Sequence, residues 1–344
     1  MKQFTWLSTS VVVLALLVGV GGCTTNPTTG RSQFNTLSRA DEIKIGTDAL
    51  PGLTQEYGGK VPNLELENYF TSLGKQLAAT TEADNPSLPW EFTLLDSDVI
   101  NAFALPGGKV FVSRGLAEKM DNEAQLASVV GHEIGHVTAR HTSERMSQQI
   151  GAGIAAALAG VIVGGITDND TIKAAAPVAF GAGSQLIVLS FSRDQELEAD
   201  ELGMRYMTKL NYDPKGAQQV MELLERESGG GGGGLFDKFL ATHPDPAARV
   251  EVVKKKLANE YAYTQGNPQY HLHADRFKQN FLAKLPAKAP AKKVDALGGR
   301  VFDLSQPAGW CSVCASRGPA VHSAKGMSLT GAFASGSVVT SVTP

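Results

Sequence analysis

Apolar residues recur every three or four positions in several stretches of the chain, which is the spacing of one face of an α-helix. The clearest case is residues 64–79, with apolar positions at Leu66, Tyr69, Phe70, Leu73 and Leu77. Residues 38–50 and 214–227 are also predicted helices, and the former has Asp41 and Glu42 in its first turn, where acidic side chains are favourable. A fourth stretch has the same spacing at Leu126, Val129, Val130, Ile134 and Val137. We therefore predict helices that each bury one face in a core.

Two further stretches follow the pattern of β-strands. Residues 90–95 alternate sufficiently to predict a strand. Residues 101–112, with the sequence NAFALPGGKVFV, predict a strand, a Pro-Gly-Gly turn and a second strand. Together the two patterns predict an α+β fold that is mostly helical and contains a small β-sheet.

The first 22 residues are typical of an export signal. Lys2 supplies a positive start, and residues 11–20 form an apolar run that is short for a membrane span. Small residues then precede Cys23, which resembles the lipobox of bacterial lipoproteins, so we expect Cys23 to be acylated; ordinary cleavage beside a cysteine is the alternative. Thr24 offers no signal for inner-membrane retention, which favours the outer membrane, facing the periplasm. Residues 23–37, which are rich in Pro, Thr and Gly around positions 26–33, are predicted to be a tether.

Two long stretches, residues 150–166 and 174–192, carry no charged side chain. They predict either a membrane hairpin or a pair of closely packed helices. Gly and Ala dominate the first stretch, and Pro177, Ser184 and Gln185 interrupt the second. This composition favours packed helices over a membrane hairpin.

The remaining features of composition concern surfaces and the tail. Glycines at 229–234 predict a tolerated surface insertion without a preferred structure. Residues 284–344 are rich in Ala, Pro, Gly, Ser and Lys and are predicted to be a disordered tail, after a folded domain at 38–283. Cys311 and Cys314 lack the second pair that a zinc site of this type needs, so a local disulfide or no role is expected. A net charge of −3 without a basic stripe argues against nucleic acid as a partner.

The strongest chemical signal is the sequence HEIGH at residues 132–136. Positions four apart share one face of a helix, so His132 and His136 can bind the same zinc ion. Glu133 is then placed to activate water rather than to bind the metal. Two solvated histidines on an exposed helix are the alternative, but the apolar residues around them indicate a buried helix in which these groups need partners.

A catalytic zinc ion uses three protein ligands, so a third ligand must come from elsewhere. The extended motif HExxHxxGxxH fails here, because Ala139 and Thr142 replace its glycine and its last histidine. His141 follows His136 by five residues and is expected to be structural or to contact a ligand.

The stretch SRDQELEAD at residues 192–200 offers the missing ligand. Glu196 and Asp200 share one helical face, so Glu196 can bind zinc while Asp200 accepts a hydrogen bond from a ligand imidazole. Glu198 and Glu201 fall on other faces and are expected to be solvated. A run of surface charges is the alternative for the whole group.

HEIGH, SRDQELEAD and the sequence THPDPAAR at residues 242–249 resemble the minigluzincin zinc endopeptidases, which include the CAAX prenyl endopeptidases and the HtpX-type quality-control proteases. NAFALPGG and ARH at residues 139–141 fit the same pattern. The resemblance covers about residues 35–283 and is strongest to the bacterial envelope lipoprotein branch, although the chain has no recognisable tetratricopeptide array. It implies a zincin-like, gluzincin catalytic core with the small sheet beside the HExxH helix.

The resemblance also implies roles for individual residues. One zinc ion per subunit would be bound by His132, His136 and Glu196, with Glu133 as general base and later as proton donor. Asp200 would be a catalytic residue that orients a ligand.

Four further residues are implied near the site. His243 would stabilise the oxyanion or transiently occupy the open zinc position, although a histidine that merely begins a helix before a proline is the alternative. Arg249 would bind substrate. Asn101 and Ala102 would lie on a strand edge to which the substrate adds as a further strand, but a plain hairpin within the sheet explains these two residues equally well.

The function predicted from the sequence is therefore a lipid-anchored zinc metalloendopeptidase of the cell envelope. Its substrates would be unfolded or misassembled envelope proteins, and its assembly partners are not specified by the sequence. An assembly or chaperone-like binding lipoprotein with little or no proteolysis is the competing hypothesis. Intact Glu133 and an intact ligand set argue against it, while a zinc hydrolase of non-peptide substrates fits HExxH alone.

Overall fold

The structure is a computed structural model, and it describes residues 23–82, 87–164, 190–229 and 237–287. These residues all belong to one compact unit that ends at Ala287. The predictions for the export signal, most of the second uncharged stretch, glycines 230–234 and the tail with Cys311 and Cys314 lie outside the described residues.

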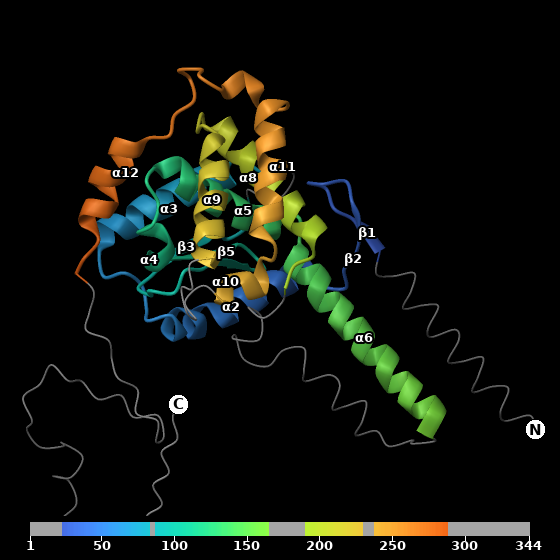
Figure 1. Cartoon of the computed structure of the whole chain (residues 1–344). Helices are drawn as coiled ribbons and strands as arrows, with labels where there is room; N and C mark the ends of the chain where they lie inside the picture. The colour runs from blue at the N-terminus through green and yellow to red at the C-terminus, as the bar shows by residue number, and fades with distance from the viewer. Residues whose placement is uncertain (1–22, 83–86, 165–189, 230–236, 288–344) are drawn as a thin grey trace, which may run out of the picture. The chain divides into compact units, whose positions relative to one another are not determined.

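Helices make up most of the described chain, and the expected α+β, mostly helical fold is confirmed (Figure 1). The α-helices are α2 (Arg39–Glu56), α3 (Leu64–Ala78), α4 (Arg114–Ala117), α5 (Glu123–Thr138), α6 (His141–Gly164), α8 (Arg193–Lys209), α9 (Lys215–Gly229), α10 (Asp237–Thr242), α11 (Pro246–Ala258) and α12 (Ala274–Asn280). The strands are β1 (Cys23–Thr25), β2 (Ser32–Phe34), β3 (Glu91–Leu95), β4 (Ala102–Leu105) and β5 (Lys109–Ser113). Two short 3-10 helices, η4 (Ala262–Thr264) and η5 (Leu282–Lys284), lie near the end of the unit.

A three-stranded sheet with the order β3-β5-β4 lies beside the helices. Strand β3 runs parallel to β5, whereas β4 and β5 form the predicted antiparallel hairpin. Gly107 and Gly108 in its turn have φ of 75° and 88°, which is the left-handed region that glycine adopts without steric cost. The hairpin therefore leaves β4 at one edge of the sheet.

The sequence predicted the extent of α3 well, but it placed the end of α2 too early. Helix α3 begins after the cap residue Asn63 and buries the predicted apolar face, as expected. Helix α2 begins after Ser38, whose side chain forms a capping box with Asp41, but it continues to Glu56. The predicted end at residue 50 was wrong, because the helix continues through Pro51. A proline removes one backbone donor, and tertiary contacts can stabilise a helix that lacks this hydrogen bond.

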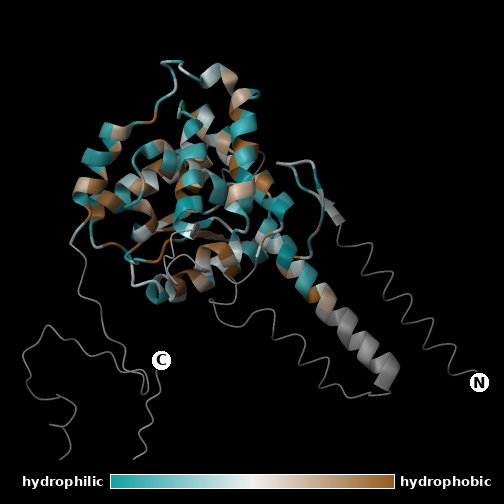
Figure 2. Ribbon diagram, viewed as in Figure 1, coloured by the Kyte–Doolittle hydropathy of each residue, from teal (hydrophilic) through white to brown (hydrophobic). Residues whose placement is uncertain are grey.

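Helix α5 is the centre of the unit. Every one of its residues is buried, and its N-terminus is capped by the Asn122 side chain, which accepts a hydrogen bond from the backbone N–H of Gln125. Its main contacts are with α8, α9, α3 and β4. Hydrophobic and hydrophilic residues alternate along the surrounding helices (Figure 2), as expected for helices that bury one face against a central element.

The segment predicted as a tether is packed against the domain instead. Strands β1 and β2 pair in an antiparallel ribbon, with Thr24 opposite Gln33. The side-chain amide of Asn26 donates to the carbonyl of Thr138 at 3.1 Å, and that of Gln33 donates to the carbonyl of Ala139 at 2.5 Å. These carbonyls lie at the C-terminal end of α5, where a helix leaves its carbonyl groups without intrahelical donors. The ribbon thus caps the central helix.

Helix α6 contains most of the first uncharged stretch. Within the described residues, no helix combines the length and the apolarity that crossing a membrane would require.

Candidate metal centre and its surroundings

The contact between α5 and α8 is unusually close because it is made by small residues. A Cβ on Gly131 would lie 3.0 Å from the carbonyl oxygen of Gly203, and a Cβ on Gly203 would lie 2.8 Å from the backbone nitrogen of His132. Larger side chains would push the helices apart. Their close approach sets the Glu196 side chain of α8 beside the two histidines of α5.

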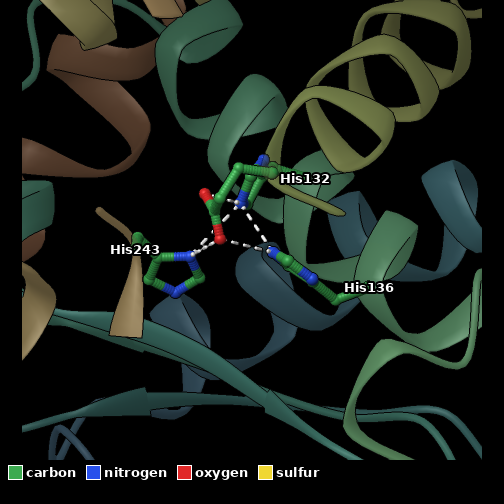
Figure 3. Close-up of side chains that lie close together, drawn as sticks. His132, His136 and His243 are labelled. Atoms are coloured by element: carbon green, nitrogen blue, oxygen red, sulfur yellow. Dashed lines mark hydrogen bonds and ion pairs between the residues drawn. The ribbon is translucent and has the colours of Figure 1, made fainter. Parts of the chain in front are cut away.

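Four buried side chains converge at this contact. His132, His136, Glu196 and His243 each offer one ligand atom, and these four atoms all lie within 4.8 Å of one another. The Nε2 atoms of His132 and His136 are 2.9 Å apart, and the Nδ1 atom of His243 lies 2.9 Å from Oε1 of Glu196. Figure 3 shows the three imidazoles facing one another. The structure therefore brings together the three residues predicted as ligands and His243, which was expected near the open zinc position.

The protonation states of His136 and Glu196 suit a cation. Burial holds the pKa of His136 well below its usual value, so the ring is neutral and Nε2 can offer a lone pair. Burial alone would raise the pKa of Glu196, but the nearby His243 and Arg249 hold it well below its usual value. A neutral imidazole and a carboxylate are the forms in which these residues bind metals.

Glu133 lies at the site without belonging to the ligand group. Its Oε1 is 3.7 Å from Nε2 of His243, and burial raises the pKa of its carboxyl group. Among the described residues, Glu133 Oε2 and His243 Nε2 are buried and have no hydrogen-bond partner. Unpartnered polar atoms beside a nitrogen and oxygen donor set are what a metal site and its substrate would satisfy, so the residues fit a metal ion.

Asp200 and Arg249 contact the candidate ligands His132 and Glu196. Asp200 Oδ1 lies 2.8 Å from Nδ1 of His132, the position expected for a group that orients a ligand imidazole. Arg249 donates to both carboxylate oxygens of Asp200, at 2.8 and 2.6 Å, and forms an ion pair with Glu196. Burial opposes the charge of Asp200, but Arg249 and His132 bring its pKa to about 2. Arg249 is only 1% exposed, so its position does not support the predicted role in substrate binding.

His141 contacts the candidate ligand His136, although the two residues lie on different helices. Helix α5 ends at Thr138, and Arg140 adopts a left-handed conformation with φ of 58° before α6 begins. This turn brings Nδ1 of His141 to 2.9 Å from Nδ1 of His136. On its other side, Nε2 of His141 lies 2.8 Å from Oε2 of Glu198. The prediction that Glu198 is merely solvated was wrong, because the turn supplies it with a partner.

Sequence reasoning missed two other neighbours of the site. Phe191 stacks on the His136 ring with a centroid distance of 3.9 Å, and Phe239 stacks on His243 at 4.9 Å. Phe239 lies on α10, the short helix that directly precedes His243. This nearness in the sequence was the only signal that Phe239 lies near the site. Both rings exclude water from the imidazoles that they cover.

Asn101 and Ala102 lie at the start of the edge strand. The backbone N–H of Ser113 donates to the carbonyl of Asn101 at 3.0 Å, so the main chain of Asn101 faces β5. Main-chain groups alternate in direction along an antiparallel strand, so those of Ala102 and Ala104 point away from β5. The side-chain amide of Asn101 instead donates to the Tyr57 hydroxyl at 3.2 Å. Of the two predicted residues, Ala102 presents main-chain groups toward the edge.

Comparison with known proteins extends these observations. Residues 65–257, more than half of the chain, match peptidase family M48. The mitochondrial metalloendopeptidase OMA1 of Schizosaccharomyces pombe is 27% identical over 256 residues, which cover 71% of this chain and 69% of that protein. The beta-barrel assembly-enhancing protease of Escherichia coli K12 is 32% identical over 236 residues, 66% of this chain and 46% of the relative, so the match spans about half of that protein.

The matched region contains α5 with HEIGH, α8 with Glu196 and Asp200, and the loop that carries His243. The resemblance to zincin-like peptidases indicated by these motifs is thereby confirmed. The chain belongs to peptidase family M48.

Proposed function

We propose that the protein is a zinc-dependent endopeptidase in which His132, His136 and Glu196 hold the metal ion. The observation that carries this proposal is the convergence of four ligand atoms within 4.8 Å of one another in a buried site. A zinc ion bound there would act as a Lewis acid toward the scissile carbonyl and would make a hydrolytic water more acidic. The residues of the chain supply everything else.

Glu133 is proposed as the proton carrier. Its Oε2 atom is buried and unpartnered among the described residues, so it is free to accept a proton from the attacking water. Burial raises the pKa of this carboxyl group, which makes the carboxylate a stronger base. The same oxygen can then return the proton to the amine that leaves.

His243 is proposed as the residue that regulates the fourth position around the metal. Its Nδ1 atom lies 2.9 Å from Glu196 Oε1 and 3.5 Å from His132 Nε2, within the ligand group itself. In this position His243 would itself be able to hold the metal ion, in competition with water and substrate. Rotated away from Glu196, the same imidazole becomes a donor for the oxyanion.

The substrate is proposed to bind as an extra strand on β4. The main-chain groups of Ala102 and Ala104 point to the edge of the sheet, where an extended peptide can pair with them. Strand β4 contacts α5, so a peptide on this edge would pass the metal ligands. Main-chain pairing accepts many sequences, which suits a protease for unfolded chains.

The location and substrates are proposed from Cys23 and from the bacterial relative. Acylation of Cys23 would anchor the protein to a membrane, and Thr24, which carries no signal for inner-membrane retention, favours the periplasmic face of the outer membrane. The relative named a beta-barrel assembly-enhancing protease supports substrates among envelope proteins. Unfolded or misassembled envelope proteins are the proposed class.

The proposal is tested by metal analysis together with cleavage of casein, an unfolded protein. We expect about one zinc ion per chain, cleavage that a chelator abolishes, and no cleavage by Glu133→Gln although this variant keeps its zinc. Cleavage by Glu133→Gln at the wild-type rate would contradict the mechanism. Zinc binding without cleavage of any unfolded protein would favour the assembly lipoprotein instead.

A further inference from the structure

A continuous chain of polar contacts leads from the N-terminal ribbon to the ligand His136. Arg31, between β1 and β2, donates from Nε to Oε2 of Glu198 at 3.2 Å. The same Glu198 oxygen lies 2.8 Å from Nε2 of His141, whose Nδ1 lies 2.9 Å from Nδ1 of His136. A residue more than one hundred positions away in the sequence thus reaches a metal ligand through two side chains.

The chemistry of this chain of contacts fixes the proton positions. A carboxylate can only accept, so the contact with Glu198 requires the proton of His141 on Nε2. The Nδ1 atom of a neutral His141 is then an acceptor, and the facing Nδ1 of His136 must be the donor. His136 with its proton on Nδ1 has a bare Nε2, which is the atom that faces the ligand group. Glu198 thereby selects the tautomer of His136 that can bind a metal ion.

Arg31 holds Glu198 where this selection operates. Its guanidinium is also bonded to both carboxylate oxygens of Glu144, at 3.0 and 2.8 Å, and Glu144 accepts a bond from Gln195 at 2.9 Å. Gln195 precedes the ligand Glu196 on α8. The guanidinium is therefore fixed from two sides and is shared between two carboxylates, the buried Glu144 and the partly exposed Glu198.

We propose that Arg31 is a positioning residue for the metal ligand His136, acting through Glu198 and His141. This inference rests on the proposed metallopeptidase function and goes beyond it, because it makes the ribbon at residues 23–34 part of the metal site. A carboxylate that orients a ligand histidine is usually adjacent to it; here a second histidine lies between them. Loss of the ribbon's contacts with the domain should then also weaken metal binding.

The first test is zinc affinity, measured by competition with a chromophoric chelator on the full chain. We expect Arg31→Ala to weaken zinc binding about tenfold and Glu198→Gln to weaken it by about tenfold or more. Because both act on the same contact, the double variant should be no weaker than Glu198→Gln alone. Arg31→Lys, which keeps the charge beside Glu198, should recover most of the affinity.

Arg205→Ala is the matched control, because the Arg205 side chain is also 36% exposed and pairs with a carboxylate, Glu82, away from the site. We expect its zinc affinity to equal that of wild type. Circular dichroism and thermal melting of each zinc-free variant show whether it is folded. If Arg31→Ala does not fold, Arg31→Lys and Glu198→Gln still test the contact.

The second measurement follows the proton itself, by nitrogen-15 NMR of the imidazoles in the zinc-free protein. We expect His136 to be protonated at Nδ1 and His141 at Nε2 in wild type and in Arg205→Ala. A second tautomer should appear in Arg31→Ala and Glu198→Gln. Unchanged zinc affinity and tautomers in Arg31→Ala, or additive losses in the double variant, would overturn the inference. Wild-type protein that binds no zinc would instead contradict the proposed function.

Discussion

Gly131 and Gly203 face each other across the contact between α5 and α8, with so little space between them that a Cβ on Gly131 would lie 3.0 Å from the carbonyl oxygen of Gly203. The proposed metal site depends on this contact, because its candidate ligands divide between the two helices. His132 follows one glycine directly, and Glu196 lies two turns before the other. The distance between α5 and α8 therefore sets the distance between the proposed ligands on the two helices.

Gly203→Ala is expected to disturb both stability and metal binding. The added Cβ would meet the backbone nitrogen of His132 at 2.8 Å, so α8 must shift. We expect a loss of about 1–3 kcal/mol in the free energy of unfolding, together with weaker zinc binding, measured by urea unfolding and chelator competition. Gly52→Ala is the control, because nothing lies within 4 Å of its Cβ and alanine favours the helix. Equal stability of the two variants would contradict the argument.

Arg249→Met is expected to destabilise the zinc-free protein strongly. The substitution leaves the buried carboxylates of Asp200 and Glu196 without their guanidinium, at a cost of about 3–5 kcal/mol. Arg205→Met removes a half-exposed ion pair and should cost less than about 1 kcal/mol. Urea unfolding in the presence of a chelator measures both. A stable Arg249→Met with a raised KM would instead restore the role in substrate binding predicted from the sequence.

We expect low pH to weaken the contact between the ribbon and the domain, because it protonates the Glu144 carboxylate that Arg31 binds. Burial would raise the pKa of Glu144, but hydrogen bonds from Arg31 and Gln195 hold it below the usual 4.5. Its contribution to stability is thus complete above about pH 4.5 and is lost as the pH falls through the lowered pKa of the folded state. The unfolding free energies of wild type and Glu144→Gln should differ near neutral pH and converge in acid. A difference that is independent of pH would refute this interpretation.

Ala104→Pro tests the binding of substrate on β4. Proline removes the N–H that points away from β5 and leaves the donors that face β5 intact. Losing one main-chain hydrogen bond should lower kcat/KM for peptides about fivefold, with thermal melting checking that the fold survives. Ala104→Gly keeps the N–H and is the control. Equal kcat/KM for the two variants, both folded, would argue against strand addition here.

The sequence was sufficient for the residues whose relation is set within one helix. His132 and His136 are four apart, as are Glu196 and Asp200, so their shared faces follow from helical geometry alone. The contact between the two pairs required the family resemblance, because no local pattern says which helix packs against which.

The error at Glu198 arose where distant segments of the chain meet. His141 was expected to be structural or to contact a ligand, and the left-handed Arg140, which follows the end of α5, allows its contact with His136. Glu198 was assigned to solvent because it lies on another face of α8 than Glu196, but its partners, His141 and Arg31, come from other parts of the chain. Asn26 and Gln33 belong to a short polar segment that resembles a linker, and the sequence does not show that their amides bond to the carbonyls left without intrahelical donors at the end of α5.

The docked ribbon would also limit how far the protein can act if Cys23 is acylated as proposed. Strand β1 begins at Cys23, and Asn26 already contacts the end of the metal helix. Three residues span at most about 10 Å, so acylation at Cys23 would hold the folded domain close to the membrane surface. Its reach would cover chains that emerge at the bilayer surface, and polypeptides in the middle of the periplasm would have to come to it.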